Sequence, residues 1–122
     1  MKTYDLLVIG FGKAGKTLAA KMSSLGKKVA LVEESSSMYG GTCINIGCIP
    51  TKTLIHAAEN HLTFEQAMAE KEVVTHRLNQ NNKANVVNAG VDLYDAKASF
   101  VSIKVIKIVF CFKQKPAYDI ET

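Results

Sequence analysis

The chain has 122 residues, 48% of them hydrophobic, and a formal net charge of +4, which suits one small domain. It has no run of eighteen apolar residues and no signal-peptide pattern at its start, so we expect a cytoplasmic protein with no membrane partner. The lysines are scattered and no aromatic residues alternate with them, which disfavours nucleic-acid binding.

The first third of the chain predicts a β-α-β unit. Residues 4–9 form an apolar run that enters a glycine turn, as expected of a buried parallel strand. Residues 13–25 have apolar side chains at helical spacing, and Gly26 supplies a stop. Residues 29–32 form a second apolar strand. The whole unit takes about 30 residues, the usual span of a parallel crossover.

The glycine turn matches the Gly-x-Gly-x-x-Gly fingerprint of dinucleotide-binding domains through Gly10, Gly12 and Gly15. In that fingerprint the glycines permit a tight turn, the approach of a pyrophosphate, and close packing of helix on strand. The helix N-terminus presents unpaired N–H groups to the anion. Glu33, at the end of the second strand, is placed to accept hydrogen bonds from a ribose.

The same turn also spells Gly-x4-Gly-Lys-Thr, the phosphate-binding pattern of nucleoside triphosphatases, in which Lys16 would contact phosphates and Thr17 magnesium. We reject this interpretation because Glu33 is placed for a ribose. In addition, no later apolar strand ends in a convincing magnesium-binding aspartate. Lys16 and Thr17 are then ordinary residues of the first helical turn.

Residues 40–52 place Cys43 and Cys48 in a glycine-framed segment. In a regular helix, Cα atoms five positions apart are separated by roughly 8–9 Å, whereas a disulfide needs about 4.4–6.8 Å. Gly47 adds backbone freedom, and Pro50 cannot donate a helical hydrogen bond. We therefore expect a distorted segment that can close the bridge.

Three interpretations of the cysteine pair are open: a redox disulfide, which we favour, a metal site, and inert thiols. Cysteine pairs in cytoplasmic chains are more often catalytic or metal-binding than structural. A metal would need two further ligands, but Cys111 is distant and the three histidines form no ligand pattern, so no metal is expected. We predict a link between Cys43 and Cys48 that leaves Cys111 outside.

The second half of the chain predicts helices followed by strands. Residues 51–61 are expected to form one helix. Thr63 and Gln66 form a capping box that opens a long polar helix to about Asn85. Strands are predicted at 91–94, 98–101 and 103–112.

Taken together, the two motifs resemble those of the class I pyridine nucleotide-disulfide oxidoreductases, which include dihydrolipoamide dehydrogenase, glutathione reductase and mercuric reductase. The family's redox motif, Gly-Gly-Thr-Cys-x-Asn-x-Gly-Cys-x-Pro-x-Lys, is met in full by residues 40–52. Residues 9–17 and 38–41 look most like the bacterial subgroup linked to resistance to reactive chlorine and hypothiocyanous acid. The resemblance implies an α/β fold, a Rossmann-like FAD-binding domain with a parallel sheet.

The resemblance also implies roles for single residues. In the intact family enzyme, hydride passes from NAD(P)H to FAD, and electrons pass on to the Cys43–Cys48 disulfide and then to a small disulfide or oxidant. Cys43 would attack the substrate, and Cys48 would face the flavin ring as the charge-transfer thiol. The residues implied for FAD binding are Gly10, Gly12 and Gly15 at the pyrophosphate, Glu33 at the adenosine ribose, Gly41 and Thr42 along the flavin nucleotide, Lys52 beside the flavin, and Ala98 at the adenine.

The chain departs from the family pattern in its length. It lacks the second glycine fingerprint for NAD(P)H, the later Gly-Asp motif for FAD, and the C-terminal domain through which family members form homodimers. We therefore expect a truncated protein, with residues 1–102 as a partial FAD-binding domain and 103–122 as an atypical tail. We expect no turnover by this chain alone. Two alternatives are a non-catalytic remnant that binds FAD weakly or not at all, and a flavin-free thiol-redox module.

The tail adds a β-prone run, 103–112, with only two charges. Such runs are aggregation hazards when they are exposed. The sequence therefore predicts poor solubility, improved by deleting the residues after Val101 or by restoring the missing strands of the FAD-binding domain.

Overall fold

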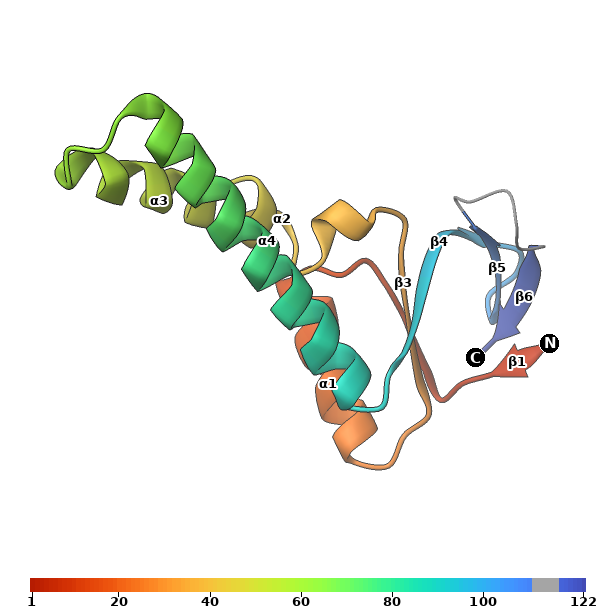
Figure 1. The fold of residues 1–122 in the computed structure, drawn as a ribbon. Helices are drawn as coiled ribbons and strands as arrows, with labels where there is room; N and C mark the ends of the chain where they lie inside the picture. Colours follow the sequence, from red (N-terminus) through yellow and green to blue (C-terminus); the bar gives the residue numbers. More distant parts are fainter. Residues whose placement is uncertain (111–116) are drawn as a thin grey trace.

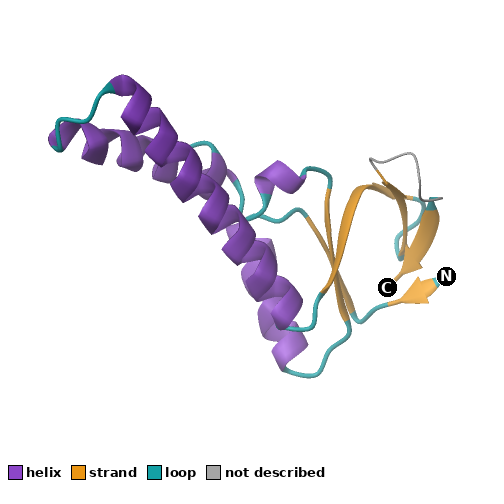
Figure 2. Cartoon of the chain, in the orientation of Figure 1, coloured by secondary structure: helices purple, strands orange, loops and turns teal. Residues whose placement is uncertain are grey.

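The computed structural model describes residues 1–110 and 117–122. Its helices lie on one side of a curled sheet, and the last strands curl round on the other side (Figures 1 and 2). The described strands are β1 (Lys2–Thr3), β2 (Leu6–Ile9), β3 (Val29–Glu33), β4 (Asp92–Phe100), β5 (Val105–Phe110) and β6 (Tyr118–Glu121). The described helices are α1 (Lys13–Ser24), the 3-10 turn η1 (Ser36–Met38), α2 (Thr42–Asn45), α3 (Cys48–Glu59) and α4 (Phe64–Asn88).

Within the described residues the sheet has the strand order β1-β6-β5-β4-β3-β2. Strands β2, β3 and β4 are parallel, with Val8 opposite Leu31 and Leu31 opposite Leu93. Strand β5 then runs antiparallel to both β4 and β6, and β1 pairs in parallel with β6. The predicted α/β fold class with a parallel sheet is confirmed, and the curl turns it into a half-barrel.

Strand β3 shows why the sheet is buried on both faces. Its residues from Val29 to Val32 are at most 1% exposed, as expected for a central parallel strand. Alternate side chains point to opposite faces. Val29 and Leu31 pack among residues of the helical side, whereas Ala30 and Val32 pack under the curl.

Helix α1 packs against β2 and β3, and the C-terminal part of α4 packs against β4. Helix α3 and the first turns of α4 form a hairpin that projects away from the sheet (Figure 1). The predicted capping box is present: Gln66 N donates to Thr63 Oγ1 at 3.3 Å, and Thr63 N donates to Gln66 Oε1 at 2.9 Å. None of the described helices is long and apolar enough to cross a membrane.

Two predicted boundaries were wrong. The helix expected at 51–61 begins at Cys48, before Pro50, because a proline in the first turn removes an N–H that has no helical partner anyway. The strands expected at 91–94 and 98–101 are one strand, β4. It changes partner along its length: Asp92–Asp95 pair with β3, and Ala96–Phe100 pair with β5.

The tail takes part in the sheet. Ile106, Ile108 and Ile120 are 5%, 0% and 0% exposed and pack in one cluster with Tyr4 and other residues of the earlier strands. Within β5, the part of the β-prone run from Val105 to Phe110, side chains alternate between inward and outward, which is the pattern of a strand with one buried face. Residues 111–116, with Cys111 and the end of the run predicted at 103–112, lie outside the described residues.

Candidate functional site

The glycine turn joins β2 to α1 at the carboxyl end of the parallel strands, where nucleotides bind in folds of this kind. Gly10 has φ 96°, a conformation that only glycine adopts without strain. Its N–H donates to Val32 O at 2.8 Å, and Phe11 N donates to Glu33 Oε2 at 2.8 Å. The turn is therefore tied to the end of β3 at two points.

Gly15 and Gly12 have different surroundings. A Cβ atom on Gly15 would lie 2.7 Å from the carbonyl oxygen of Gly10 and 2.9 Å from Val8 Cγ1, so the close packing of α1 on β2 requires glycine. A Cβ atom on Gly12 would meet no atom of the described chain within 4 Å. The space beside Gly12 is therefore open, with room for a bound group.

The N-terminus of α1 is open to an anion. Gly12 precedes the helix as its N-cap, no side chain caps it, and the first turn has no acidic residue. The first N–H groups of a helix lack intrahelical partners and carry the positive end of its dipole. This part of the chain fits the pyrophosphate of a dinucleotide.

A cavity of about 270 Å³ opens beside the turn. Gly10, Glu33 and Ala98 all line it, although they come from three separate elements. The Glu33 carboxylate accepts from Phe11 N and also from Ser35 N, at 3.1 Å. These two bonds fix its orientation, and each oxygen has a further lone pair for a hydroxyl donor. The cavity thus collects three of the predicted binding residues.

The cysteine segment is seated directly on the glycine turn. Gly41 has φ 85°, and a Cβ atom there would lie 3.0 Å from Gly12 Cα. Helix α2 starts at the next residue, Thr42. The two motifs, separated in sequence by a whole strand, therefore meet at the N-terminus of α1.

The segment is distorted as predicted. Cys43 lies in α2 and Cys48 begins α3. Between them the N–H groups of Ile46 and Gly47 both donate to Thr42 O, at 2.9 and 2.8 Å. Both cysteines are exposed free thiols, and they lie close enough for each to affect the ionisation of the other. The disulfide between them stays a prediction.

The neighbouring thiol and two lysines have opposite effects on Cys43. Donation by the Cys43 S–H to Cys48 is the main cause that raises the pKa of the Cys43 thiol, because it stabilises the protonated form; some desolvation and the charge of Cys48 add to it. The cations of Lys52 and Lys13 act to lower that pKa. Lys52 lies in α3, four residues after Cys48, and its role beside the flavin stays a prediction.

Replacing Cys48 by alanine should lower the pKa of Cys43, and replacing Lys52 by methionine should raise it. Only the thiolate reacts with iodoacetamide, so the pH of half-maximal alkylation should move down in Cys48→Ala and up in Lys52→Met. Mass spectrometry of Cys43 in a Cys111→Ser background measures it. Lys27→Met, far from the thiols along the chain, is the control. An unmoved midpoint in Cys48→Ala would argue against the thiol contact.

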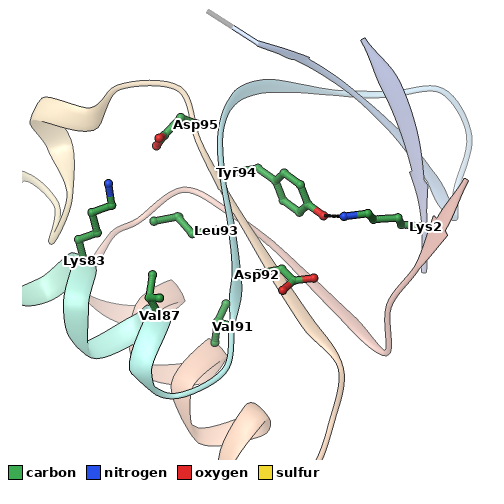
Figure 3. A pocket seen from close by; sticks show the side chains of 8 residues that line it. All are labelled: Lys2, Lys83, Val87, Val91, Asp92, Leu93, Tyr94 and Asp95. Atoms are coloured by element: carbon green, nitrogen blue, oxygen red, sulfur yellow. Dashed lines mark hydrogen bonds between the residues drawn. The ribbon is translucent and has the colours of Figure 1, made fainter. Parts of the chain in front are cut away.

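A second cavity, of about 440 Å³, lies along β4 between α4 and β1 (Figure 3). Three of its polar groups are bonded to tyrosines: Lys2 Nζ donates to Tyr94 Oη at 3.1 Å, Asp92 accepts from Tyr4 Oη at 2.6 Å, and Asp95 accepts from Tyr39 Oη. The first two bonds tie the N-terminal strand to β4.

Sequence reasoning gave no role to two asparagines that hold the cysteine segment, Asn45 and Asn79. Asn45 is part of the family's redox motif, but the motif alone does not indicate what its side chain binds. Asn79 sits in a helix full of polar residues, where nothing distinguishes one buried amide. No group of three or more possible metal-ligating side chains occurs in residues 1–110 and 117–122.

A family model described as pyridine nucleotide-disulphide oxidoreductase matches residues 4–115. The chain belongs to this family. The match continues past residue 102, and the division of the chain at that residue stays a prediction. As a family member, the chain is related to oxidoreductases that are flavoprotein disulfide reductases.

Individual members of the pyridine nucleotide-disulphide oxidoreductases agree with this assignment. The probable pyridine nucleotide-disulfide oxidoreductase RclA of Escherichia coli (strain K12) is 46% identical over 109 residues, 88% of this chain and 25% of that protein. The mercuric reductase of Staphylococcus aureus is 34% identical, over 86% of this chain and 22% of that protein.

A solved structure agrees as well. The Cu(II) complex of the HOCl-induced flavoprotein disulfide reductase RclA from Escherichia coli matches with a TM-score of 0.91 and 42% identity, and the match covers 99% of this chain and 27% of that one. The chain thus spans about a quarter of the length of these relatives.

Proposed function

We propose that this chain is the flavin-binding, disulfide-bearing part of an FAD-dependent NAD(P)H:disulfide oxidoreductase of the cytoplasm. One observation carries the proposal: Gly41, two residues before Cys43, packs against Gly12 at the open N-terminus of α1. A redox-type thiol pair therefore lies beside a turn shaped for a dinucleotide. FAD, when bound, would supply electrons to that pair.

The residues around the turn fit FAD. Gly10 and Gly15 give the turn its shape, and Gly12 with the first N–H groups of α1 would hold the pyrophosphate. Glu33 would accept from the adenosine ribose, since its carboxylate is already oriented by two backbone N–H groups. Ala98, which lines the same cavity, would contact the adenine. Thr42 and Lys52, near the cysteines, would adjoin the flavin end.

The thiol pair would carry out disulfide exchange. The thiolate of Cys43 attacks one sulfur of a small disulfide substrate and displaces the other as a thiol. Cys48 then attacks the sulfur of Cys43, releases the second thiol, and leaves a Cys43–Cys48 disulfide. Two electrons and two protons pass from the pair to the substrate. A small oxidant is the second kind of substrate in this proposal. In the longer protein, NAD(P)H and a partner subunit would complete the site.

The proposal predicts FAD binding that depends on Gly12. A methyl group in the open space at Gly12 should weaken binding of FAD about tenfold or more, because it occupies the anion's position. Quenching of flavin fluorescence during titration measures the affinity, and far-ultraviolet circular dichroism checks that Gly12→Ala is folded. Thr17→Ala is the matched control, because it changes the same turn of the chain. Thr17 would bind magnesium only in the rejected triphosphatase interpretation, so this variant should leave FAD binding unchanged.

The outcomes separate the alternatives. Equal FAD affinity in the parent chain and in Gly12→Ala would contradict the assigned site. A parent chain that exchanges disulfides but binds no FAD would be the flavin-free thiol module. A parent chain that binds FAD weakly and forms no Cys43–Cys48 disulfide would be the non-catalytic remnant.

A further inference from the structure

Asn79 is a buried amide in the otherwise polar helix α4. It is 5% exposed and is the one buried polar or charged residue found in the described part of the chain. Its Nδ2 donates to Ser36 O at 3.2 Å and to Asn45 Oδ1 at 3.1 Å, while its Oδ1 accepts from Gln80 Nε2 at 3.1 Å. Because a buried amide costs free energy unless it is bonded, these partners explain why it is tolerated there.

Asn45 links Asn79 to the backbone of the cysteine segment. Its own Nδ2 donates to Tyr39 O at 2.9 Å and to Gly41 O at 2.8 Å. The amide thus spans the glycine turn that precedes α2, while its oxygen is held by Asn79. Both amides have their donors and acceptors assigned by these partners.

Helix α2 has only four residues, Thr42–Asn45. A single turn of helix has almost no stability of its own, because nucleation costs more than one hydrogen bond returns. The position of Cys43 is therefore set by what holds the two ends of α2. One end rests on Gly12 through Gly41, and the other is held through Asn45.

Helix α4 has a second contact with the same region, three residues further along. Asn82 accepts from Lys16 Nζ of α1, and its side chain adjoins the place where a Cβ atom of Gly40 would be, at 3.1 Å. Residues three apart share one face of a helix. One face of α4 thus holds both α1 and the segment that carries Cys43.

We propose that Asn79 is a positioning residue for the thiol pair: through Asn45 it fixes α2, and thereby sets how readily Cys43 and Cys48 interconvert between dithiol and disulfide. This inference rests on the proposed redox function of the pair. Ring closure depends on the two sulfurs being held in reacting geometry, and an ordered pair gains a high effective concentration. Loss of the Asn79 bonds leaves α2 free to sample other positions, so the disulfide becomes less favourable.

The test measures the exchange equilibrium of the 122-residue chain, in a Cys111→Ser background. In the measured reaction, the two thiols and one glutathione disulfide give the Cys43–Cys48 disulfide and two reduced glutathiones, so electrons and protons balance. Acid quenching and mass spectrometry give the fraction oxidised across a series of glutathione buffers. The quantity compared between variants is the equilibrium constant.

Asn79→Leu is close to asparagine in shape, is neutral, and cannot donate. We expect it to lower the equilibrium constant for disulfide formation about tenfold. Asn81→Leu, at an exposed position two residues after Asn79, is the matched control and should leave the equilibrium constant for disulfide formation unchanged. Val86→Ala, which removes a buried side chain of α4, should lower the urea midpoint of unfolding without lowering the exchange constant.

A second variant keeps the test decisive if Asn79→Leu does not fold. Asn45→Ala removes the other partner at a less buried position and should give a similar fall. Where both variants fold, combining them should cost little more than either alone, because they break the same connection.

Two results would overturn the inference: exchange constants within twofold of the parent in Asn79→Leu and Asn45→Ala, or an equal fall in Val86→Ala. A parent chain that forms no Cys43–Cys48 disulfide would instead remove the proposed redox function, and this inference with it.

Discussion

Replacing Gly15 by alanine should lower the free energy of unfolding by about 3 kcal/mol or more, enough to remove cooperative folding from a marginally stable chain. The added Cβ would lie 2.7 Å from the carbonyl oxygen of Gly10 and 2.9 Å from Val8 Cγ1. A backbone oxygen cannot rotate away as a side chain can, so α1 would have to lift off β2. Urea unfolding followed by circular dichroism measures the effect.

Gly12→Ala is the natural control, since the same methyl group there meets no protein atom within 4 Å. Its free energy of unfolding should stay within about 0.5 kcal/mol of the parent's. Equal stability of Gly15→Ala and Gly12→Ala would show that α1 can shift without cost and that the close packing is not required.

Deleting the residues after Val101, 102–122, should leave a chain that does not fold cooperatively. The sequence suggested the opposite, a gain in solubility. However, the deletion removes the buried side chains of Ile106, Ile108 and Ile120, and losing one buried isoleucine typically costs about 2–5 kcal/mol. A domain has only about 5–15 kcal/mol of stability in total. The urea transition and its cooperativity are the measurements.

Single substitutions test the same point without changing the length of the chain. Ile108→Ala should cost about 2–5 kcal/mol, whereas Val109→Ala, at a side chain that is 47% exposed, should cost well under half of that. A shortened chain with the parent's sharp transition would mean that the curl contributes little to the core.

The parts of the site that could be predicted from the sequence are those with strict backbone requirements. Gly10 at φ 96° and the crowded Gly15 are positions where only glycine fits. Cys43 and Cys48 are five positions apart, and a disulfide cannot bridge that spacing in a regular helix; the structure breaks the helix there. In each case a covalent or steric rule acts within a few residues, so the local sequence is sufficient.

The parts that could not be predicted depend on distant partners. Asn79 is buried because Ser36 and Asn45, 43 and 34 residues away, accept its hydrogen bonds. Likewise, the run after residue 102 promotes aggregation if it is exposed, but it stabilises the fold when it pairs with β4 and packs against Tyr4. Hydrophobic pattern alone gives the strand but not its partner.

Strand β4 has a consequence for how this protein opens. One continuous strand supplies Asp92–Asp95 to β3 and Ala96–Phe100 to β5, so unfolding of β4 removes the partner of both strands at once. Local opening follows cooperative units of this sort. The amide hydrogens of β3 and β5 should therefore exchange with solvent water through one common opening, while those of the projecting α3–α4 hairpin exchange independently and sooner.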